Sequence, residues 1–268
     1  MRQKIFDCIT FFQENMISNI RFEILNDSVD YFVVCESEYD HKGNKKNLNF
    51  KILNKKFKDK IIYLVLDKPF NLNNSPWKNQ ALQRDYILKK LDNVGQEDYI
   101  MFSDPDEIPN PQILKNLNLK MKYGIFLQNM YCYKFNLFNK YESPWEGTRV
   151  CKKKNLKSID YMRQKVLKKN LNKAFWKFYK EKNIEIIENG GWHFNSIISP
   201  EEISKKLKTF AHTEFSKNQY SDINIIKKNI EEHKDLFGRN ITYTKVNMDN
   251  SFPEYILKNQ NNLKEWIL

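Results

Sequence analysis

Glycine, proline and cysteine are scarce in this 268-residue sequence, and it contains no long hydrophobic run. The 7 Gly and 8 Pro residues exclude collagen-like, linker-like and Gly-rich repeat architectures. No stretch reaches the roughly 18 apolar residues that a membrane-spanning helix needs, and the apolar run over residues 5–12 is too short for a signal peptide. We therefore expect a globular protein with a cytoplasmic location.

The four cysteines are far apart in the sequence. They have neither the paired spacing of a zinc site nor the density of a disulfide-stabilised domain. We expect reduced, buried thiols at Cys8, Cys35, Cys132 and Cys151.

Basic residues outnumber acidic ones. The 45 Lys and Arg against 33 Asp and Glu give a net charge of +12, which favours anionic partners such as nucleic acid, phosphorylated ligands or an acidic membrane surface. The interleaving of Lys with Asn and Ile favours compositional bias in an AT-rich coding sequence over a binding surface. Because 41% of the residues are hydrophobic and 14% aromatic, the chain has enough apolar surface to fold.

Hydrophobic periodicity predicts alternating strands and helices in the first half of the chain. Apolar runs bounded by polar residues favour strands over 5–12, 31–35, 60–66 and 98–102, with helices over 17–25 and 78–91 between them. This alternation is typical of an α/β fold with a mostly parallel sheet flanked by helices. In the second half we expect strands near 125–129, 131–136 and 184–187 and helices over 200–210 and 222–233. No Pro/Gly-rich linker divides the chain, so we expect one domain over residues 1–268.

Acidic residues follow three of the predicted strands. Glu36, Asp67 and the pair Asp104 and Asp106 stand at these strand ends. Ligands of open parallel sheets bind beyond the carboxyl ends of the strands, so we expect one acidic cleft there.

The Asp104-Pro105-Asp106 segment is the sharpest chemical feature. Two carboxylates two residues apart after a buried strand can present oxygen ligands to Mg²⁺ or Mn²⁺, and such an ion can neutralise a departing diphosphate. The alternative is a solvated acidic turn that caps the following helix.

Other residues qualify as ligand contacts, each with a structural alternative. His193 follows Gly190 and Gly191 and would be a third metal ligand or a phosphate contact; alternatively it packs under the neighbouring aromatic rings. His212, two residues before Glu214, qualifies in the same way, or stands at a helix end. Trp77, Gln80 and Arg84 would face a nucleotide from one helix, unless Arg84 is paired with an acidic neighbour. Glu14 and Arg21 indicate a structural ion-pair face or a buried brace.

Taken in order, several blocks of this sequence resemble family 17 glycosyltransferases. The blocks cover most of the chain: residues 6–14, Arg21, residues 29–37, Gln83-Arg84, residues 103–109, residues 190–194 and residues 210–214. The loop over 38–43 matches the family only loosely. The lack of the membrane anchor and stem of the Golgi members makes a bacterial or viral relative the expectation.

The resemblance implies a GT-A-like nucleotide-diphospho-sugar transferase fold, with a Rossmann-like central sheet, an inverting mechanism, Mn²⁺ or Mg²⁺, and a UDP-sugar donor such as UDP-GlcNAc. Residues 1–110 would be the nucleotide-sugar half and 111–268 the acceptor half. The implied metal ligands are Asp106, Asp104 and His212. The implied donor contacts are Glu36, Ser37, Arg84, Asp104 and His193.

An inverting transfer also needs a base that removes the proton of the acceptor hydroxyl. Glu107, Glu146 and Glu214 are the candidates; we favour Glu214, with Asp104 as the second catalytic carboxylate. Trp145 and Trp192 are candidates for stacking on a sugar.

The expected acceptor is a glycan or a lipid-linked saccharide, and the basic charge is compatible with peripheral membrane contact. Two alternatives stay open. One is an inactive relative that only binds a sugar nucleotide. The other, which we disfavour, is a nucleic-acid-binding protein that uses the basic segment 152–182 with Trp176 and Tyr179.

Overall fold

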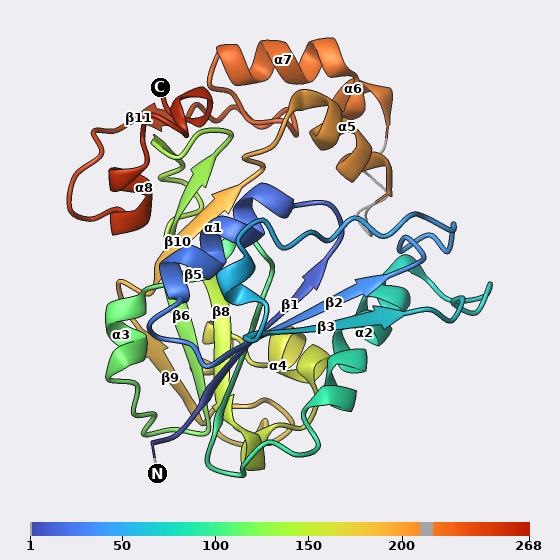
Figure 1. The fold of residues 1–268 in the computed structure, drawn as a ribbon, viewed down its shortest axis with the longest axis vertical. Helices are drawn as coiled ribbons and strands as arrows, with labels where there is room; N and C mark the ends of the chain where they lie inside the picture. The colour runs from blue at the N-terminus through green and yellow to red at the C-terminus, as the bar shows by residue number, and fades with distance from the viewer. Residues whose placement is uncertain (1, 210–216) are drawn as a thin grey trace.

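The computed structural model describes residues 2–209 and 217–268, and these residues form an α/β fold around one large sheet (Figure 1). The main path of the sheet runs in the order β11-β7-β6-β8-β4-β1-β2-β3; β9 and β10 pair with β6, and β5 pairs with β10. The strands are β1 Ile5–Phe11, β2 Tyr31–Ser37, β3 Ile61–Leu66, β4 Tyr99–Ser103, β5 Glu107–Pro109, β6 Tyr123–Cys132, β7 Leu137–Phe138, β8 Trp145–Lys152, β9 Ile184–Ile187, β10 Gly191–Asn195 and β11 Thr244–Lys245. The helices are α1 Asn15–Leu25, α2 Pro76–Tyr86, α3 Pro111–Lys115, α4 Ile159–Lys165, α5 Pro200–Thr209, α6 Asn218–Ser221, α7 Ile223–Glu231 and α8 Glu254–Lys258.

The first half of the chain has the predicted parallel arrangement. Strand β1 pairs in parallel with both β2 and β4, and β2 pairs in parallel with β3. The order β4-β1-β2-β3, built from strands that alternate with helices, confirms the GT-A-like α/β class that the sequence predicted.

The two faces of this sheet are covered by different helices. Side chains alternate along β1, so that Ile5 and Ile9 pack with α1 on one face, whereas Phe6 and Cys8 pack with α4 on the other. All four cysteines are free and buried, as predicted, and burial raises the pKa of three of their thiols to about 12: Cys35, Cys132 and Cys151.

The second half differs from the expectation in several of its strands. The predicted strands over 125–129 and 131–136 are a single strand, β6, that ends at Cys132, because the chain turns at Tyr133 with a φ of 66°. Strand β8 was not predicted; it pairs antiparallel with β4 and β6 and joins the two halves into one sheet. The predicted division into halves within a single domain stays a prediction.

Strand β10 brings the second half to the end of β4. It lies between β5 and β6, and its register places His193 opposite Glu107. Gly191 permits this approach: its φ is 122°, and a Cβ there would lie 2.2 Å from the carbonyl oxygen of Ile108. Close packing of β10 against β5 therefore requires glycine at position 191.

Helices α5, α6 and α7 form a cap beside the carboxyl ends of β1 and β10 (Figure 1, upper right). Ile203 of α5 and Ile226 of α7 pack together in a third core cluster with Met130 of β6. No helix among residues 2–209 and 217–268 is long and apolar enough to cross a bilayer.

Candidate active site

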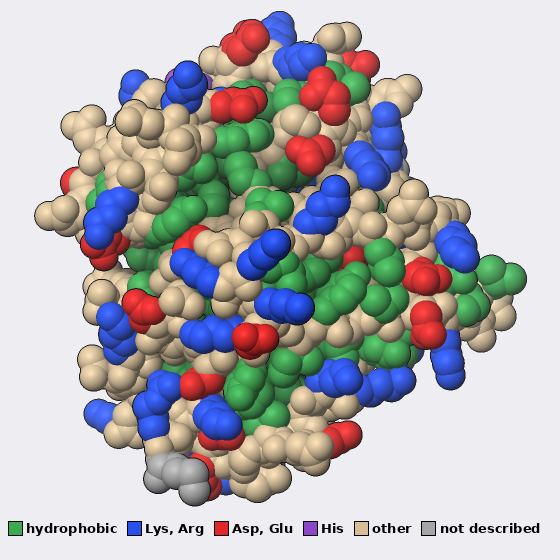
Figure 2. All heavy atoms as spheres, viewed as in Figure 1, with side chains coloured by type: hydrophobic (Ala, Val, Ile, Leu, Met, Phe, Trp, Pro, Cys, Tyr) green, Lys and Arg blue, Asp and Glu red, His purple; other side chains and the backbone are tan. Residues whose placement is uncertain are grey.

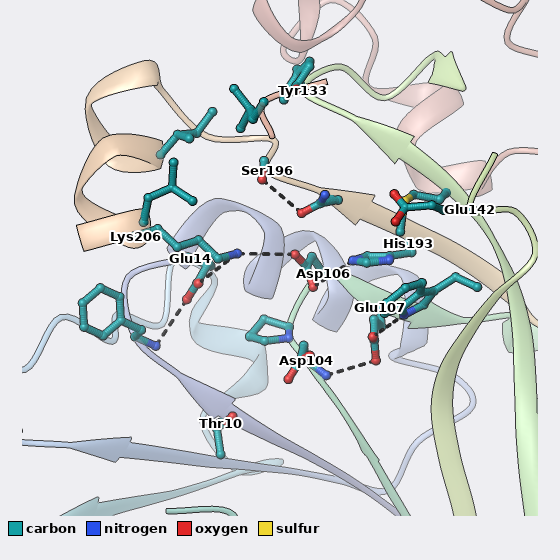
Figure 3. A pocket seen from close by; sticks show the side chains of 18 of the residues that line it. Thr10, Glu14, Asp104, Asp106, Glu107, Tyr133, Glu142, His193, Ser196 and Lys206 are labelled. Atoms are coloured by element: carbon teal, nitrogen blue, oxygen red, sulfur yellow. Dashed lines mark hydrogen bonds and ion pairs between the residues drawn. The ribbon is translucent and has the colours of Figure 1, made fainter. Parts of the chain in front are cut away.

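A cavity of about 610 Å³ opens between the carboxyl ends of β1 and β4, strand β10 and the helical cap. Asp104 and Asp106 line it, as predicted (Figure 3). The expected cleft of three acidic strand ends is only partly present, because Asp67 is exposed and neither it nor Glu36 lines the cavity. The carboxyl end of β4 therefore supplies the acidic centre of this site.

Each aspartate has a cationic partner. Oδ2 of Asp104 accepts a hydrogen bond from Nη2 of Arg163 at 2.8 Å. Asp106 lies 3.6 Å from Nε2 of His193 and 3.7 Å from Nζ of Lys206. Burial alone would raise the pKa of both carboxyl groups, but these cations outweigh it and hold both pKa values below their ordinary range. Both aspartates are therefore ionised near neutral pH.

Lys206 is the residue that the sequence did not suggest. It lies on α5 and places its ammonium 3.7 Å from Oε1 of Glu14 and 3.7 Å from Oδ2 of Asp106 (Figure 3). Burial lowers its pKa, but the carboxylates of Asp106 and Glu14 more than reverse this, so its pKa is raised. The ammonium is a fixed positive charge inside the cavity.

His193 faces the cavity with one ring nitrogen unengaged. Its Nδ1 is buried and has no hydrogen-bond partner in the described part of the chain, while Nε2 faces Asp106. Burial lowers the pKa of His193, but Asp106 outweighs it and the pKa is raised. The ring packs against Trp145, with centroids 5.2 Å apart. Nδ1 is thus a buried polar atom without a partner among the described residues, and the predicted role of His193 toward a metal or a phosphate stays a prediction.

Glu107 is buried in a network that holds Arg163. Its two carboxylate oxygens accept hydrogen bonds from Nη1 and Nη2 of Arg163 at 2.9 and 2.7 Å, and Oε1 also accepts one from Nε1 of Trp145 at 2.7 Å. Both oxygens are therefore occupied, which disfavours Glu107 as the acceptor base. Instead it orients Arg163 toward Asp104, and Trp145 toward the cavity.

The predicted buried brace is present, with a different partner. Nε and Nη2 of Arg21 donate to the carboxylate of Asp7 at 2.7 and 2.6 Å, and Nη1 donates to the backbone carbonyl of Glu107 at 2.6 Å. Glu14 is not part of this brace. Its Oε2 accepts hydrogen bonds from the backbone N–H groups of Phe12 and Gln13, and its Oε1 faces Lys206.

Of the predicted ligand contacts on β2 and α2, Gln80 lines the cavity, whereas Glu36, Ser37 and Arg84 do not. Glu36 is fully buried, and its carboxylate accepts hydrogen bonds from Lys46 at 2.8 Å and Tyr63 at 2.8 Å. Ser37 is also buried, and its hydroxyl accepts a hydrogen bond from the backbone N–H of Tyr39. Arg84 is paired with Asp160 at 3.0 Å, which is the structural alternative considered for it. Their predicted roles toward the donor stay predictions.

The structure also places Trp192 and Glu146, two further residues that the sequence analysis named. Trp192 does not line the cavity: it is buried in the core cluster shared by α1, β6 and β10 and donates its indole N–H to the carbonyl of Ser251, so it is not placed to stack on a sugar there. Glu146 does not line the cavity, and its carboxylate accepts from the backbone N–H of Lys168. His212 and Glu214 lie outside the described residues.

The opposite wall of the cavity is polar and aromatic. Glu142 accepts hydrogen bonds from Asn139 at 2.9 Å and from Arg239 at 3.0 Å. Arg239 also pairs with the buried Asp235 at 2.6 Å. Local sequence patterns did not indicate this wall, because Glu142 and Arg239 lie about 100 residues apart in the chain.

A divalent ion would fit this site if phosphate oxygens of a bound ligand completed its coordination. Among the described residues, no group of three or more Asp, Glu, His or Cys side chains is arranged to hold an ion. Mg²⁺ in nucleotide sites, however, needs only one or two carboxylates because substrate phosphates complete its coordination. Asp104 and Asp106 can supply these.

Comparisons with known proteins agree with the blocks found in the sequence. The family model of glycosyltransferase family 17 matches residues 1–254. The β-1,4-mannosyl-glycoprotein 4-β-N-acetylglucosaminyltransferases of Rattus norvegicus and Homo sapiens are each 29% identical over 117 residues, which cover 40% of this chain and 22% of the relative. The matched part is thus about a fifth of the relatives' length.

Two solved structures also show similarity. A 4-diphosphocytidyl-2C-methyl-D-erythritol synthase is 11% identical, covers 70% of this chain and 90% of its own, and has a TM-score of 0.37. A glycosyltransferase involved in the glycosylation of the major capsid of PBCV-1 is 10% identical, covers 69% and 81%, and has a TM-score of 0.30. Because the family model spans nearly the whole sequence, the resemblance is confirmed: the chain belongs to glycosyltransferase family 17.

Proposed function

We propose that this chain transfers a sugar, with inversion, from a UDP-sugar to a glycan or a lipid-linked saccharide. UDP-GlcNAc is the first candidate donor, because the relatives that match this chain are named as N-acetylglucosaminyltransferases. The observation that carries the proposal is the pair Asp104 and Asp106 at the carboxyl end of β4, ionised and facing a cavity that also contains Lys206.

The cations at this site match the charge that develops during transfer. As the bond between the sugar and the diphosphate breaks, negative charge grows on the departing diphosphate. Lys206 and the raised-pKa His193 are held within 4 Å of Asp106, so they are positioned before the donor binds. Preorganised charges of this kind stabilise a transition state without reorganising during the reaction.

A divalent metal ion bound by Asp104 and Asp106 would supply further positive charge to the same diphosphate. The chain's own task there is to keep both carboxylates ionised and oriented. Arg163 does this for Asp104, and it is itself fixed by the two oxygens of Glu107.

The acceptor is proposed to bind against Trp145, Glu142 and Arg239. An indole ring beside charged hydrogen-bonding groups is the usual surface for a sugar ring with its hydroxyls. Glu214 remains our proposed base, with Asp104 as the second catalytic carboxylate. Among the described carboxylates, Glu107 is saturated by Arg163 and Trp145, as shown above.

A thermal-shift experiment with UDP-, GDP-, dTDP- and CMP-sugars, with and without Mn²⁺, tests this proposal. A ligand at 100 times its Kd stabilises the native state by about 2.7 kcal/mol, which would raise the melting temperature by roughly 5 °C or more for a chain of this size. We expect this shift with a UDP-sugar, and we expect Asp106→Asn to abolish it.

The matched control is Asp67→Asn, which also removes a carboxylate at a strand end but from an exposed position outside the cavity. This variant should retain the full shift and release UDP at the wild-type rate. An Asp106→Asn protein with a wild-type shift and full transferase activity would refute the assigned site. Undiminished activity in saturating EDTA would refute the metal requirement alone.

A further inference from the structure

A loop with exposed aromatic side chains lies outside the candidate active site. We name residues 171–182 the aromatic loop; it connects the 3-10 turn after α4 to strand β9. Five of the sixteen exposed large hydrophobic side chains in the described part of the chain lie within nine residues of this loop: Leu171, Phe175, Trp176, Phe178 and Tyr179. The four aromatic rings are 63–85% exposed, so they contribute little to the core.

Hydrogen bonds and a ring contact within the aromatic loop define its shape. Lys182 Nζ donates a hydrogen bond to the carbonyl of Ala174 at 2.6 Å, and the backbone N–H of Lys177 donates to the same carbonyl at 3.0 Å. The rings of Phe175 and Trp176 meet edge to face, 5.1 Å apart. The loop is therefore an organised projection that presents aromatic rings to the solvent.

Positive charge is concentrated on and beside this loop. Residues 165–182 contain seven Lys and one Glu, a net charge of +6 within a chain whose total is +12. On the face shown in Figure 2, in contrast, Lys and Arg are interspersed with Asp and Glu. Half of the charge excess thus falls within 18 residues around the exposed rings.

We propose that the aromatic loop docks this protein on an anionic phospholipid bilayer. Aromatic rings favour the membrane–water interface, and each Lys near an anionic surface adds about 1 kcal/mol of attraction. A single-stranded nucleic acid would instead need a groove that tracks its backbone beside the stacking rings, whereas these rings project outward. The combination of projecting rings and surrounding lysines matches a lipid surface.

The position of the loop is compatible with catalysis on a docked protein. The loop enters the sheet at Ile184, which pairs with Tyr123 at the start of β6. The cavity is lined by Met130, seven residues further along the same strand, so the two points are roughly 20 Å apart at about 3.3 Å per residue. The cavity is therefore not part of the docking surface.

Vesicle co-sedimentation tests the proposal on the full chain. We expect binding to vesicles of phosphatidylcholine with 30% phosphatidylglycerol, and none to phosphatidylcholine alone. Replacing Lys173, Lys177 and Lys180 with Gln should weaken binding roughly 100-fold, since each Lys contributes about fivefold. Lys182 is left in place because it closes the loop.

Replacing the four aromatic residues of the loop with Ala should also abolish binding. The control for charge is Lys51, Lys58 and Lys68→Gln, which removes three exposed lysines far from the loop in the sequence and should weaken binding much less. Because the substituted side chains are exposed or only partly buried, the melting temperature of each variant should stay close to that of the wild type, and this measurement separates lost docking from lost folding.

Tryptophan fluorescence locates the contact. The emission of the wild type should shift to the blue when anionic vesicles are added, Trp176→Phe should remove this shift, and Trp77→Phe should retain it. Wild-type protein that does not bind anionic vesicles, or four-alanine protein that binds like the wild type, would overturn the proposal. So would loop-dependent binding to polynucleotide or loop-dependent dimerisation in the absence of vesicle binding.

Discussion

Lys206 gives the sharpest prediction, because its ammonium contacts Asp106, one of the two carboxylates that we propose as ligands of a divalent ion. Its two contacts, with Asp106 and Glu14, are both 3.7 Å long. At this distance one pair of unit charges attracts by about 1 kcal/mol in water and about 4.5 kcal/mol at an effective dielectric constant of 20. The Lys206 side chain is 20% exposed, so we use the lower value for each contact.

Lys206→Met should therefore release Asp106 and Glu14 and tighten the binding of Mn²⁺ to the nucleotide-free protein. Two contacts of about 1 kcal/mol correspond to roughly 30-fold in affinity. The same variant should transfer sugar more slowly, because the diphosphate loses a fixed positive charge. The assay is a titration of the wild type and the variant with Mn²⁺, in which electron paramagnetic resonance reports the free ion.

The matched control is Lys208→Met, which removes an exposed lysine two residues further along α5 and should leave Mn²⁺ affinity unchanged. If Lys206→Met bound Mn²⁺ no more tightly than the wild type, the ammonium would not compete with the ion, and the assigned position of the metal would be wrong.

Three further predictions concern the framework of the site. Arg163→Gln should lower the free energy of unfolding in urea by about 3–5 kcal/mol, since it leaves the buried Glu107 without its cationic partner. The control is Arg2→Gln, which removes the exposed pair of Arg2 with Asp30 and should lower it by under about 1 kcal/mol. Equal losses would refute this reasoning. Gly191→Ala should destabilise the protein by at least about 2 kcal/mol more than Gly43→Ala, because only at Gly191 would a Cβ collide with backbone; both positions have positive φ. Equal unfolding midpoints would contradict that. His193 has a raised pKa, so its contribution to stability is present below pH 6.5 and is lost as pH rises through its folded-state pKa. His193→Gln should accordingly reduce the fall in melting temperature between pH 5.5 and 8.5, and an unchanged fall would disprove the assignment.

The sequence predicted best the strands and site residues that a local pattern of apolar and polar residues determines. The parallel strands β1, β2 and β4 were predictable because each is a short buried run with a polar residue at its end. The same rule identified Asp104 and Asp106, since the carboxyl end of a buried strand is set by local sequence alone. The position of β6 was less clear, because its ten residues include the polar Gln128 and Asn129 within an apolar run.

The cations of the site could not be found in this way. Arg163 lies in a basic segment where it looks like one cation among many, and Lys206 is one of three lysines on α5. Their carboxylate partners lie 59 and 100 residues away for Asp104 and Asp106, so only the folded sheet brings them together. The partners of Glu36 were not visible in the sequence either: its carboxylate accepts hydrogen bonds from Lys46 and Asn49 of the following loop.

The brace from Arg21 to the carbonyl of Glu107 has a consequence for how this protein meets its ligands. The turn between β4 and β5 is tied to the central strand through Asp7, so its shape does not depend on what enters the cavity. Ligand binding there need not order a loop first, which is the largest entropic loss at many nucleotide sites. Substitution of Asp7 or Arg21, neither of which lines the cavity, would then alter donor affinity without removing a direct contact to the donor.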